Sequence, residues 1–384
     1  MIRIGITGQA GFVGTHLYNT LGLSPAKFER IPFEDAFFSD DKKLKEFVQN
    51  CDAIVHLAAM NRHKDPEVLY QTNIGLVNQL IAACEATNST PHILFSSSTQ
   101  EERDNLYGKS KKEGRELLEK WADKNNAQFT GFIIPNVYGP FGNPYYNSVV
   151  ATFCHQLTHN EQPKIDVDGQ IKLIYVAQLV MHFIERIELI QSENANDCVI
   201  EEIKVQPTIE IKVSALLNLL ETFKTAYFDK GEIPSLDTPF KRDLFTTFLN
   251  YIDHASFFPF KLKMNTDERG SFIETIKLNS GGQISFSTTV PGITRGDHFH
   301  TRKAERFAVI KGKARIELRR IGTDKVLSFE LDGNEPSFVD MPIWYTHNIT
   351  NIGEDELYTI FWISEHFDSN DPDTYFEKVQ ITRI

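Results

Sequence analysis

The pattern of this chain changes near residue 258, and that change limits the fold more than any other feature of the sequence. Up to about residue 135, short runs rich in β-branched residues alternate with helical patterns. The expected strands are 2–7, 53–57, 92–96 and 129–134, and the expected helices are 13–21, 68–86 and 107–123. Such alternation is typical of a doubly wound parallel sheet, so we expect an α/β Rossmann-like fold in this part of the chain.

The last part of the chain has a different texture. From about residue 258, short strands are separated by turns such as 279–282 and 331–334. Frequent turns without helical stretches predict an all-β barrel. At 384 residues the chain is also too long for one ordinary core. We therefore expect two domains, at 1–252 and 258–384, and the helical patterns at 215–227 and 241–251 fall at the end of the first.

Composition excludes several classes of protein. The formal net charge of −12 argues against a nucleic-acid binder or a partner of anionic membranes. No signal-peptide pattern precedes the first strand and no segment approaches about 18 consecutive apolar residues, so we expect a cytoplasmic protein that does not enter the membrane. The cysteines form no CxxC pair, and reduced, mostly buried thiols are expected at Cys51, Cys84, Cys154 and Cys198.

A glycine-rich turn directly follows the first expected strand and opens the first helix. Glycines let the backbone approach a pyrophosphate, and the helix N-terminus adds free amides and a favourable dipole. The turn therefore predicts a nucleotide site, with Gly8, Gly11, Phe12, Val13 and Gly14 as the cofactor-binding residues.

A Tyr-x3-Lys pair opens the helix at 107–123. Tyr107 and Lys111 lie on one face of that helix. Free tyrosine titrates near pKa ~10, so an ammonium group that stabilises the phenolate is needed for acid-base work at neutral pH. Ser98, with Thr99 as the alternative, ends the preceding strand at the edge where ligands bind in open α/β sheets.

Three histidines and a glutamate in the last part of the chain have the spacing of a metal site. His298 and His300 project from the same face of a strand, since side chains alternate with period two. Glu305 follows five residues later, and His347 completes the set. Three imidazoles and one carboxylate suit zinc, iron, nickel or manganese and do not select among them.

The spacing around these ligands resembles the two motifs of the cupin superfamily of small β-barrels. The first motif runs from Gly292 to Gly312, and the second from Pro342 to Asn351. Trp344 stands where cupins usually carry glycine. Two further residues near the ligands, Lys303 and Tyr345, are candidate proton carriers.

The first part of the chain resembles the extended short-chain dehydrogenase/reductase (SDR) family. That resemblance implies that Tyr107 is the general acid-base residue, that Lys111 lowers its pKa and holds the nicotinamide ribose, and that Ser98 hydrogen-bonds the substrate carbonyl. It also places Leu57, Ala58 and Ala59 beside the cofactor, and Asn136 at the sugar nucleotide.

Cofactor choice depends on the end of the second strand. Glu29 would bind a ribose diol, whereas Arg30 would bind a 2′-phosphate. We favour NADPH through Arg30, with NADH as the alternative.

Over nearly its full length the chain resembles the bifunctional capsule and O-antigen enzymes of the CapF/WbjC type, in which an SDR domain precedes a cupin domain. The matching segments include 143–154, with Asn147 as a substrate residue, 264–272 and 372–376. The resemblance implies a UDP-4-keto-6-deoxy-N-acetylhexosamine substrate, epimerised at C3 in the cupin and reduced at C4 with NADPH. It further implies a UDP-2-acetamido-2,6-dideoxy-L-talose product on the way to UDP-N-acetyl-L-fucosamine, a homodimer, and a divalent metal, zinc in such enzymes.

Three alternatives remain open at this stage. The cupin could be a structural, dimerising module attached to a single-function 4-ketoreductase. The chain could be a redox-sensing nucleotide binder, which the intact set of Ser98, Tyr107 and Lys111 disfavours. It could also be an iron cupin dioxygenase, which the fused sugar reductase disfavours.

Overall fold

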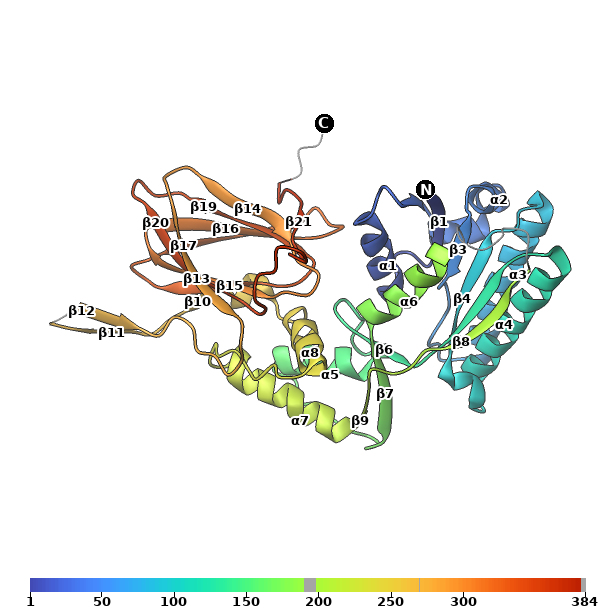
Figure 1. The fold of residues 1–384 in the computed structure, drawn as a ribbon. Helices are drawn as coiled ribbons and strands as arrows, with labels where there is room; N and C mark the ends of the chain where they lie inside the picture. The colour runs from blue at the N-terminus through green and yellow to red at the C-terminus, as the bar shows by residue number, and fades with distance from the viewer. Residues whose placement is uncertain (190–197, 269, 381–384) are drawn as a thin grey trace. The chain divides into compact units, whose positions relative to one another are not determined.

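The structure is a computed structural model and describes residues 1–189, 198–268 and 270–380 (Figure 1). The chain forms two compact units. The first contains Met1–Val149 and Gly169–Lys212, and the second contains Val150–Asp168 and Val213–Ile384. In the matching segment 264–272, Arg269 lies outside the described residues.

The first unit is built on a six-stranded parallel sheet with the order β2-β1-β3-β4-β5-β8. Its strands are β1 (Ile2–Thr7), β2 (Phe28–Ile31), β3 (Ala53–His56), β4 (His92–Ser98), β5 (Phe129–Ile134) and β8 (Ile200–Lys204). A smaller sheet joins β6 (Asn136–Tyr138), β7 (Gln170–Tyr175) and β9 (Ile209–Lys212). The doubly wound α/β fold expected from the sequence is confirmed.

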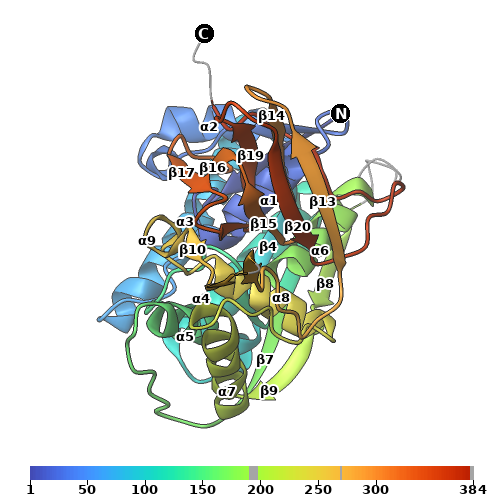
Figure 2. The same cartoon turned by 90° about the vertical axis from the view of Figure 1, so that its left-hand side faces the viewer.

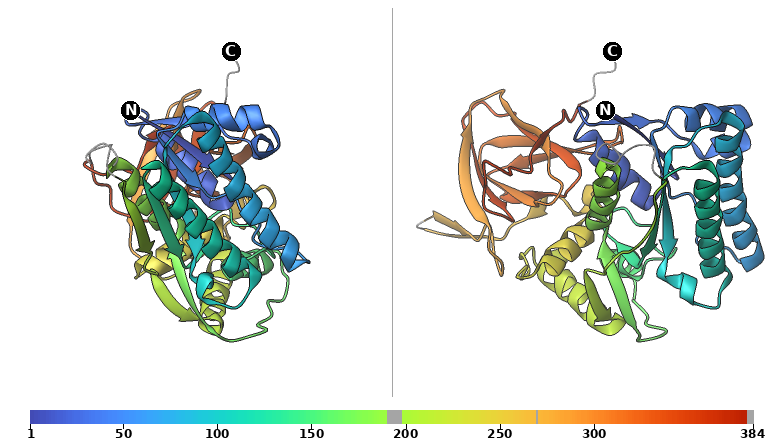
Figure 3. Two further views of the ribbon diagram at one scale, coloured as in Figure 1. Left: turned by 90° about the vertical axis from the view of Figure 1, so that its right-hand side faces the viewer. Right: turned by 45° about the vertical axis from the view of Figure 1, so that its right-hand side comes forward.

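Neighbouring residues of a strand point to opposite faces of the sheet, so the apolar side chains of both faces need a covering layer. Helices form that layer on both faces of the large sheet. The core on one face combines Leu94 with side chains of α1 (Phe12–Gly22) and α6 (Val176–Leu189). The core on the other face combines Ile93 and Phe95 with α2 (Asp41–Gln49), α3 (Pro66–Thr87) and α4 (Leu106–Asn125). Figure 3 shows α3 and α4 side by side along the sheet.

Capping residues fix the ends of α4, the helix that carries the Tyr-x3-Lys pair. The side chain of Asn105 accepts a hydrogen bond from the Gly108 amide at 2.7 Å, which satisfies a free donor of the first turn. Asn126 ends the helix in the left-handed conformation, with φ of 50°. Tyr107 and Lys111 therefore lie in the first two turns.

The second unit contains two five-stranded antiparallel sheets, with orders β10-β18-β15-β20-β13 and β17-β16-β19-β14-β21. Its strands are β10 (Phe260–Lys261), β13 (Gln283–Thr289), β14 (Thr294–Phe299), β15 (Glu305–Lys311), β16 (Lys313–Arg320), β17 (Val326–Asp332), β18 (Ser337–Met341), β19 (Tyr345–Asn351), β20 (Leu357–Ile363) and β21 (Tyr375–Phe376). Figure 2 shows β13, β20 and β15 along one wall. The hairpin of β11 (Met264–Asp267) and β12 (Gly270–Ile273) extends away from both sheets (Figure 1). This arrangement confirms the expected cupin fold.

Helices also belong to the second unit, and the unit boundaries differ from a single break near residue 255. Segments 150–168 and 213–252, which the sequence placed with the first domain, pack in the second unit. They carry α5 (Val149–Thr158), α7 (Val213–Phe223), the π-helical turn Lys224–Phe228 and α8 (Pro239–Leu249), and the short helix α9 (His254–Phe257) follows. The boundary at 253–257 between the two expected domains stays a prediction.

Two expectations about composition can be compared with the structure. Cys51, Cys84 and Cys154 are buried and Cys198 is exposed, and all four are free thiols, as expected. Within residues 1–189, 198–268 and 270–380, no helix is long and apolar enough to cross a membrane.

Candidate functional site

The glycine turn lies at the carboxyl end of β1, against the carboxyl end of β3. Gly8 has φ of 71°, and a Cβ there would come within 2.9 Å of the Ala58 amide nitrogen. A Cβ on Gly14 would come within 2.3 Å of the Gly8 carbonyl oxygen. Both positions therefore need glycine. Because no side chain caps the N-terminus of α1 at Gly11, the first-turn amides can face a phosphate.

Leu57, Ala58 and Ala59 follow β3 directly and lie beside this turn. The Leu57 amide donates to the Thr7 carbonyl at 3.2 Å, and the Ala58 amide donates to the Thr7 hydroxyl at 3.3 Å. The structure therefore brings the predicted cofactor residues of two strand ends together.

A polar network that the sequence analysis missed connects this edge to the tyrosine helix. The side chain of Asn73 in α3 accepts from the Met60 amide at 2.7 Å, donates to the Met60 carbonyl at 3.1 Å, and donates to the Ser110 hydroxyl at 3.0 Å. Asn73 is 5% exposed. It belongs to no recognisable sequence motif, so only the structure identifies it.

The predicted substrate residues lie in different surroundings. The Asn147 side chain donates to the Asn61 carbonyl at 2.9 Å, two residues after Ala59, and the hydroxyl oxygen of Tyr146 accepts from the Asn61 amide at 3.2 Å. Asn136 starts β6 and is exposed. Asn147 is thus brought to the nucleotide edge, and Tyr146 is a neighbour that sequence reasoning did not identify.

Ser98, Tyr107 and Lys111 gather at the carboxyl end of β4. Ser98 and Tyr107 are hydrogen-bonded through their side chains. The Lys111 ammonium donates to the Ser96 carbonyl at 2.8 Å and lies 6.0 Å from the centre of the Tyr107 ring. The three predicted catalytic side chains of this unit therefore share one site.

Burial dominates the ionisation of this group. Burial and the neighbouring Tyr146 raise the pKa of Tyr107 to about 12, although the Ser98 hydrogen bond opposes that shift. Burial also lowers the pKa of Lys111 to about 8. The pKa of Tyr107 is therefore raised in this structure, whereas the SDR resemblance implies that Lys111 lowers it.

Arg30 does not reach the glycine turn. In the parallel register of β1 and β2 it pairs with Ile4, four residues before Gly8, a separation of about 13 Å along the strand. Its guanidinium carbon lies 4.2 Å from the centre of the Tyr18 ring, and its Nη1 donates to the Tyr18 carbonyl at 3.1 Å. The binding of a 2′-phosphate by Arg30 stays a prediction.

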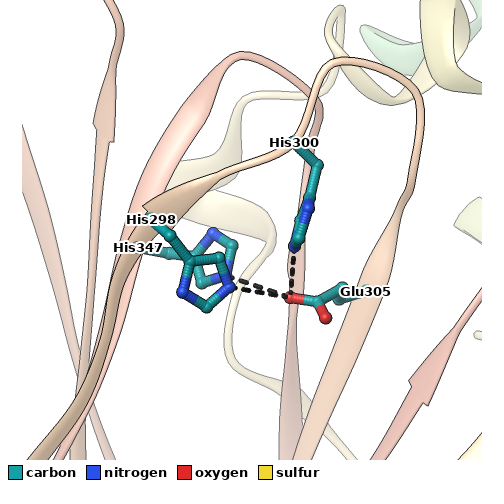
Figure 4. A group of neighbouring side chains, drawn as sticks. All are labelled: His298, His300, Glu305 and His347. Atoms are coloured by element: carbon teal, nitrogen blue, oxygen red, sulfur yellow. Dashed lines mark ion pairs between the residues drawn. The ribbon is translucent and has the colours of Figure 1, made fainter. Parts of the chain in front are cut away.

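The second site is a cluster of the four predicted metal ligands between the two sheets (Figure 4). His298 in β14 lies directly opposite His347 in β19, and Glu305 begins β15 in the other sheet. Oε2 of Glu305 is 3.2 Å from Nε2 of His300, 3.0 Å from that of His347 and 4.0 Å from that of His298. One ligand atom from each residue lies within 4.8 Å of the others.

The electrostatics of this cluster fit a cation. Nε2 of His300, Nε2 of His347 and Oε2 of Glu305 are buried without a partner of hydrogen-bond geometry. Burial by itself raises the pKa of Glu305, but the imidazoles of His300 and His347 outweigh it and hold this pKa far below its usual range. Burial and the neighbouring His347 lower the pKa of His298 to about 4. Burial alone would lower the pKa of His300, but Glu305 and Asp373 raise it above its usual value. His298 and Glu305 are thus in the forms that bind a divalent metal, a neutral imidazole and an ionised carboxylate.

The turn before β19 explains an unusual residue. Trp344, where cupins usually carry glycine, has φ of 63°, a left-handed conformation that side chains rarely adopt. Its amide donates to the His300 carbonyl at 2.8 Å, and its ring stacks on Phe299 with centres 5.6 Å apart. This packing holds the turn in a conformation that glycine would adopt more easily.

The two candidate proton carriers are held by other groups. Lys303 is 3% exposed, and its ammonium donates to the Pro372 carbonyl at 2.8 Å. Tyr345 packs edge-on against His254, with ring centres 5.3 Å apart, and burial raises the pKa of its phenol.

Comparison with known proteins identifies the relatives of both units. Residues 4–194 match the NAD dependent epimerase/dehydratase family, and residues 265–375 match the polysaccharide biosynthesis C-terminal domain. A UDP-2-acetamido-2,6-beta-L-arabino-hexul-4-ose reductase of Pseudomonas aeruginosa is 33% identical over 378 residues, which cover 97% of this chain and 98% of that protein. The crystal structure of the capsular polysaccharide assembling protein CapF from Staphylococcus aureus is 33% identical, with a TM-score of 0.61, and the match covers 98% of this chain and 100% of that one.

The chain belongs to the CapF family.

The CapF-family architecture of an SDR unit and a cupin unit therefore holds for this chain. A UDP-glucose 4-epimerase from Thermotoga maritima, solved with UDP-glucose, is 19% identical with a TM-score of 0.53, and the match covers 65% of this chain and 98% of that one. At this identity the likeness shows only a shared fold.

Proposed function

We propose that this chain is a bifunctional UDP-sugar enzyme that epimerises a UDP-4-keto-6-deoxy-N-acetylhexosamine at C3 and reduces it at C4. The observation that carries the proposal is the 33% identity, over 97% of the chain, to a reductase whose name specifies a UDP-linked 4-keto sugar. The product would be UDP-2-acetamido-2,6-dideoxy-L-talose, on the way to UDP-N-acetyl-L-fucosamine for capsule or O-antigen.

Reduction at C4 is assigned to the SDR unit. A nicotinamide cofactor would supply the hydride, and the family resemblance favours NADPH over NADH. Tyr107 is the proton donor to the carbonyl oxygen, the role that the SDR resemblance implies. Ser98, which is hydrogen-bonded to Tyr107, orients that oxygen, and Lys111 holds the ribose.

The cofactor and sugar contacts follow from the same edge of the sheet. Gly8, Gly11, Phe12, Val13 and Gly14 hold the pyrophosphate, and Leu57, Ala58 and Ala59 line the cofactor on the β3 side. Asn136 and Asn147 bind the sugar nucleotide. Asn147 is supported by its hydrogen bond to Asn61, which lies two residues beyond Ala59.

Epimerisation at C3 is assigned to the cupin unit. A ketone at C4 acidifies the C3–H bond, so one carbonyl serves both reactions. A divalent cation, with zinc as our proposal, would be held by His298, His300, Glu305 and His347 and would act as a Lewis acid. Lys303 is the proposed proton carrier, and we expect the active assembly to be a homodimer.

A second candidate function is a single-function 4-ketoreductase whose cupin is structural. One observation favours it: the Lys303 ammonium is already bound by the Pro372 carbonyl. A proton carrier must be able to reach C3, and this contact ties the amine to the chain.

The experiment is incubation of the full-length, zinc-loaded protein with the UDP-4-keto sugar and NADPH, followed by NMR of the products. We expect oxidation of NADPH and a 6-deoxy sugar inverted at C3 and reduced at C4. A product with unchanged configuration at C3 would support the single-function alternative. No oxidation of either NADPH or NADH would reject the reductase assignment.

A further inference from the structure

The segment Asp371–Phe376 packs against β14, the strand that carries His298 and leads to His300. Strand β21 pairs with β14 in antiparallel register, so that Phe376 lies opposite His298 and Tyr375 opposite Phe299. The Tyr375 ring also stacks on the Phe299 ring, with centres 5.3 Å apart. The chain therefore contacts the histidine strand again about 75 residues later.

Asp373 is the centre of this contact. Its carboxylate accepts from the Thr301 amide at 3.0 Å, from the Thr301 hydroxyl at 2.6 Å, and from the amides of Arg302 and Lys303, each at 3.1 Å. Its residue is 2% exposed and has φ of 42°. A buried carboxylate with four donors from one turn fixes the conformation of that turn, which joins His300 to Glu305.

The backbone of the same residue acts on His300 directly. Nδ1 of His300 donates its proton to the Asp373 carbonyl oxygen. With the proton on Nδ1, the lone pair of Nε2 points to the cluster, where Oε2 of Glu305 lies 3.2 Å away. Such an outer hydrogen bond sets the tautomer and orientation of a metal-binding imidazole.

We propose that Asp373 is a positioning residue for the metal site. By accepting from the 301–303 turn, its carboxylate keeps its own backbone carbonyl against Nδ1 of His300. The inference rests on the metal site of the proposed function. It adds a role for the segment Asp371–Phe376, which has no role in that function. Asp373 would make no contact with the metal. Its effect would pass through His300.

The test measures zinc affinity of the full-length protein by competition with a chromophoric chelator. In Asp373→Asn, one carboxylate oxygen becomes an amide that faces backbone or hydroxyl donors, so part of the turn loses its acceptor. We expect zinc affinity to fall about 10- to 100-fold, the usual effect of losing an outer-shell partner. The matched control is Asp371→Asn, which removes an exposed ion pair with Arg302 and should leave zinc affinity unchanged.

A double-mutant cycle separates positioning from a general loss of folding. If Asp373 acts through His300, Asp373→Asn should weaken zinc binding in the wild-type background and add little in His300→Ala. Equal weakening in both backgrounds would overturn the proposal, because a structural role alone predicts it. Thr301→Val, which removes only the hydroxyl donor, provides a milder variant with a smaller expected loss if Asp373→Asn does not fold.

The metal site and the role of Asp373 can be refuted separately. Wild-type protein that binds no zinc would overturn the metal site and this inference together. Wild-type protein that binds zinc, with unchanged affinity in Asp373→Asn, would overturn the inference and leave the metal site standing.

Discussion

A buried ion pair on the far side of the Glu305 strand gives the most direct prediction about stability. The Arg306 guanidinium donates to both oxygens of Asp340, at 2.8 and 2.9 Å, and to the Gly231 carbonyl at 2.6 Å. The Tyr227 hydroxyl donates to the same carboxylate. Arg306 is 1% exposed, Asp340 3% and Tyr227 0%. The group therefore joins β15 and β18 to the helical segment before residue 232.

Replacement of Asp340 by Ala should cost about 3–5 kcal/mol in the free energy of unfolding. Removal of one partner leaves the Arg306 charge buried and unpaired, and breaking such pairs costs roughly this amount. The Tyr227 hydroxyl also loses its acceptor, which adds about 1–3 kcal/mol if no water replaces it. Because typical domains have a total stability of about 5–15 kcal/mol, the variant should be near the limit of folding.

The assay is urea unfolding followed by tryptophan fluorescence, which reports mainly on the second unit because Trp344 and Trp362 lie there. The control is Glu335→Ala, which breaks the Lys261 pair whose side chains are 74% and 73% exposed. We expect that control to cost less than about 1 kcal/mol. A loss of unfolding free energy below about 1 kcal/mol in Asp340→Ala would refute the claim that the buried pair anchors the helices.

Three other predictions follow from the SDR unit. Tyr107→Phe should lower C4 reduction about 10²- to 10⁴-fold, because the proton donor is lost; a near wild-type rate of NADPH oxidation would reject this role. Arg30→Ala should weaken NADPH binding more than NADH binding, because only NADPH carries the 2′-phosphate that this guanidinium is proposed to bind; equal changes for both cofactors in titrations would reject that assignment. Burial, with a contribution from Arg186, lowers the pKa of His92 to about 3, so below about pH 6.5 the unfolded chain binds more protons and stability falls as the pH falls toward 3. His92→Gln should flatten that dependence in urea unfolding between pH 7 and 5, and an identical slope would contradict the assignment.

Local signals explain why much of the first unit could be predicted from the sequence. The glycine turn and the Tyr107 helix depend on residues within a few positions, such as the Asn105 cap and the positive φ of Gly8. The surroundings of Arg30 depend on the register of β2 against β1. That register is a contact between distant segments, and no local pattern specifies it.

In the second unit, too, local patterns predicted only part of the structure. The cluster of His298, His300, Glu305 and His347 could be predicted because their spacing resembles the two cupin motifs. The packing of 213–252 in this unit depends on tertiary contacts such as that between Tyr227 and Asp340, which helical periodicity does not reveal. Nor does sequence spacing indicate that Asp373 holds the turn after His300.

Because of these contacts, the central claim should be tested on the full-length protein and not on a fragment. A fragment starting near residue 258 would lose Tyr227 and the helices that pack with the barrel, so its failure to react would be uninformative. Full-length protein with Tyr107→Phe is the better material, because it keeps the whole cupin unit while C4 reduction is blocked.

The decisive measurement is deuterium incorporation at C3 of the UDP-4-keto-6-deoxy-N-acetylhexosamine in heavy water, with zinc-loaded Tyr107→Phe protein and no nicotinamide. Enolisation changes no oxidation state, so we expect exchange at C3 without cofactor, and we expect none in the same protein carrying His347→Ala. Exchange at background level in the metal-loaded Tyr107→Phe protein would contradict C3 epimerisation by the cupin and leave a single-function reductase.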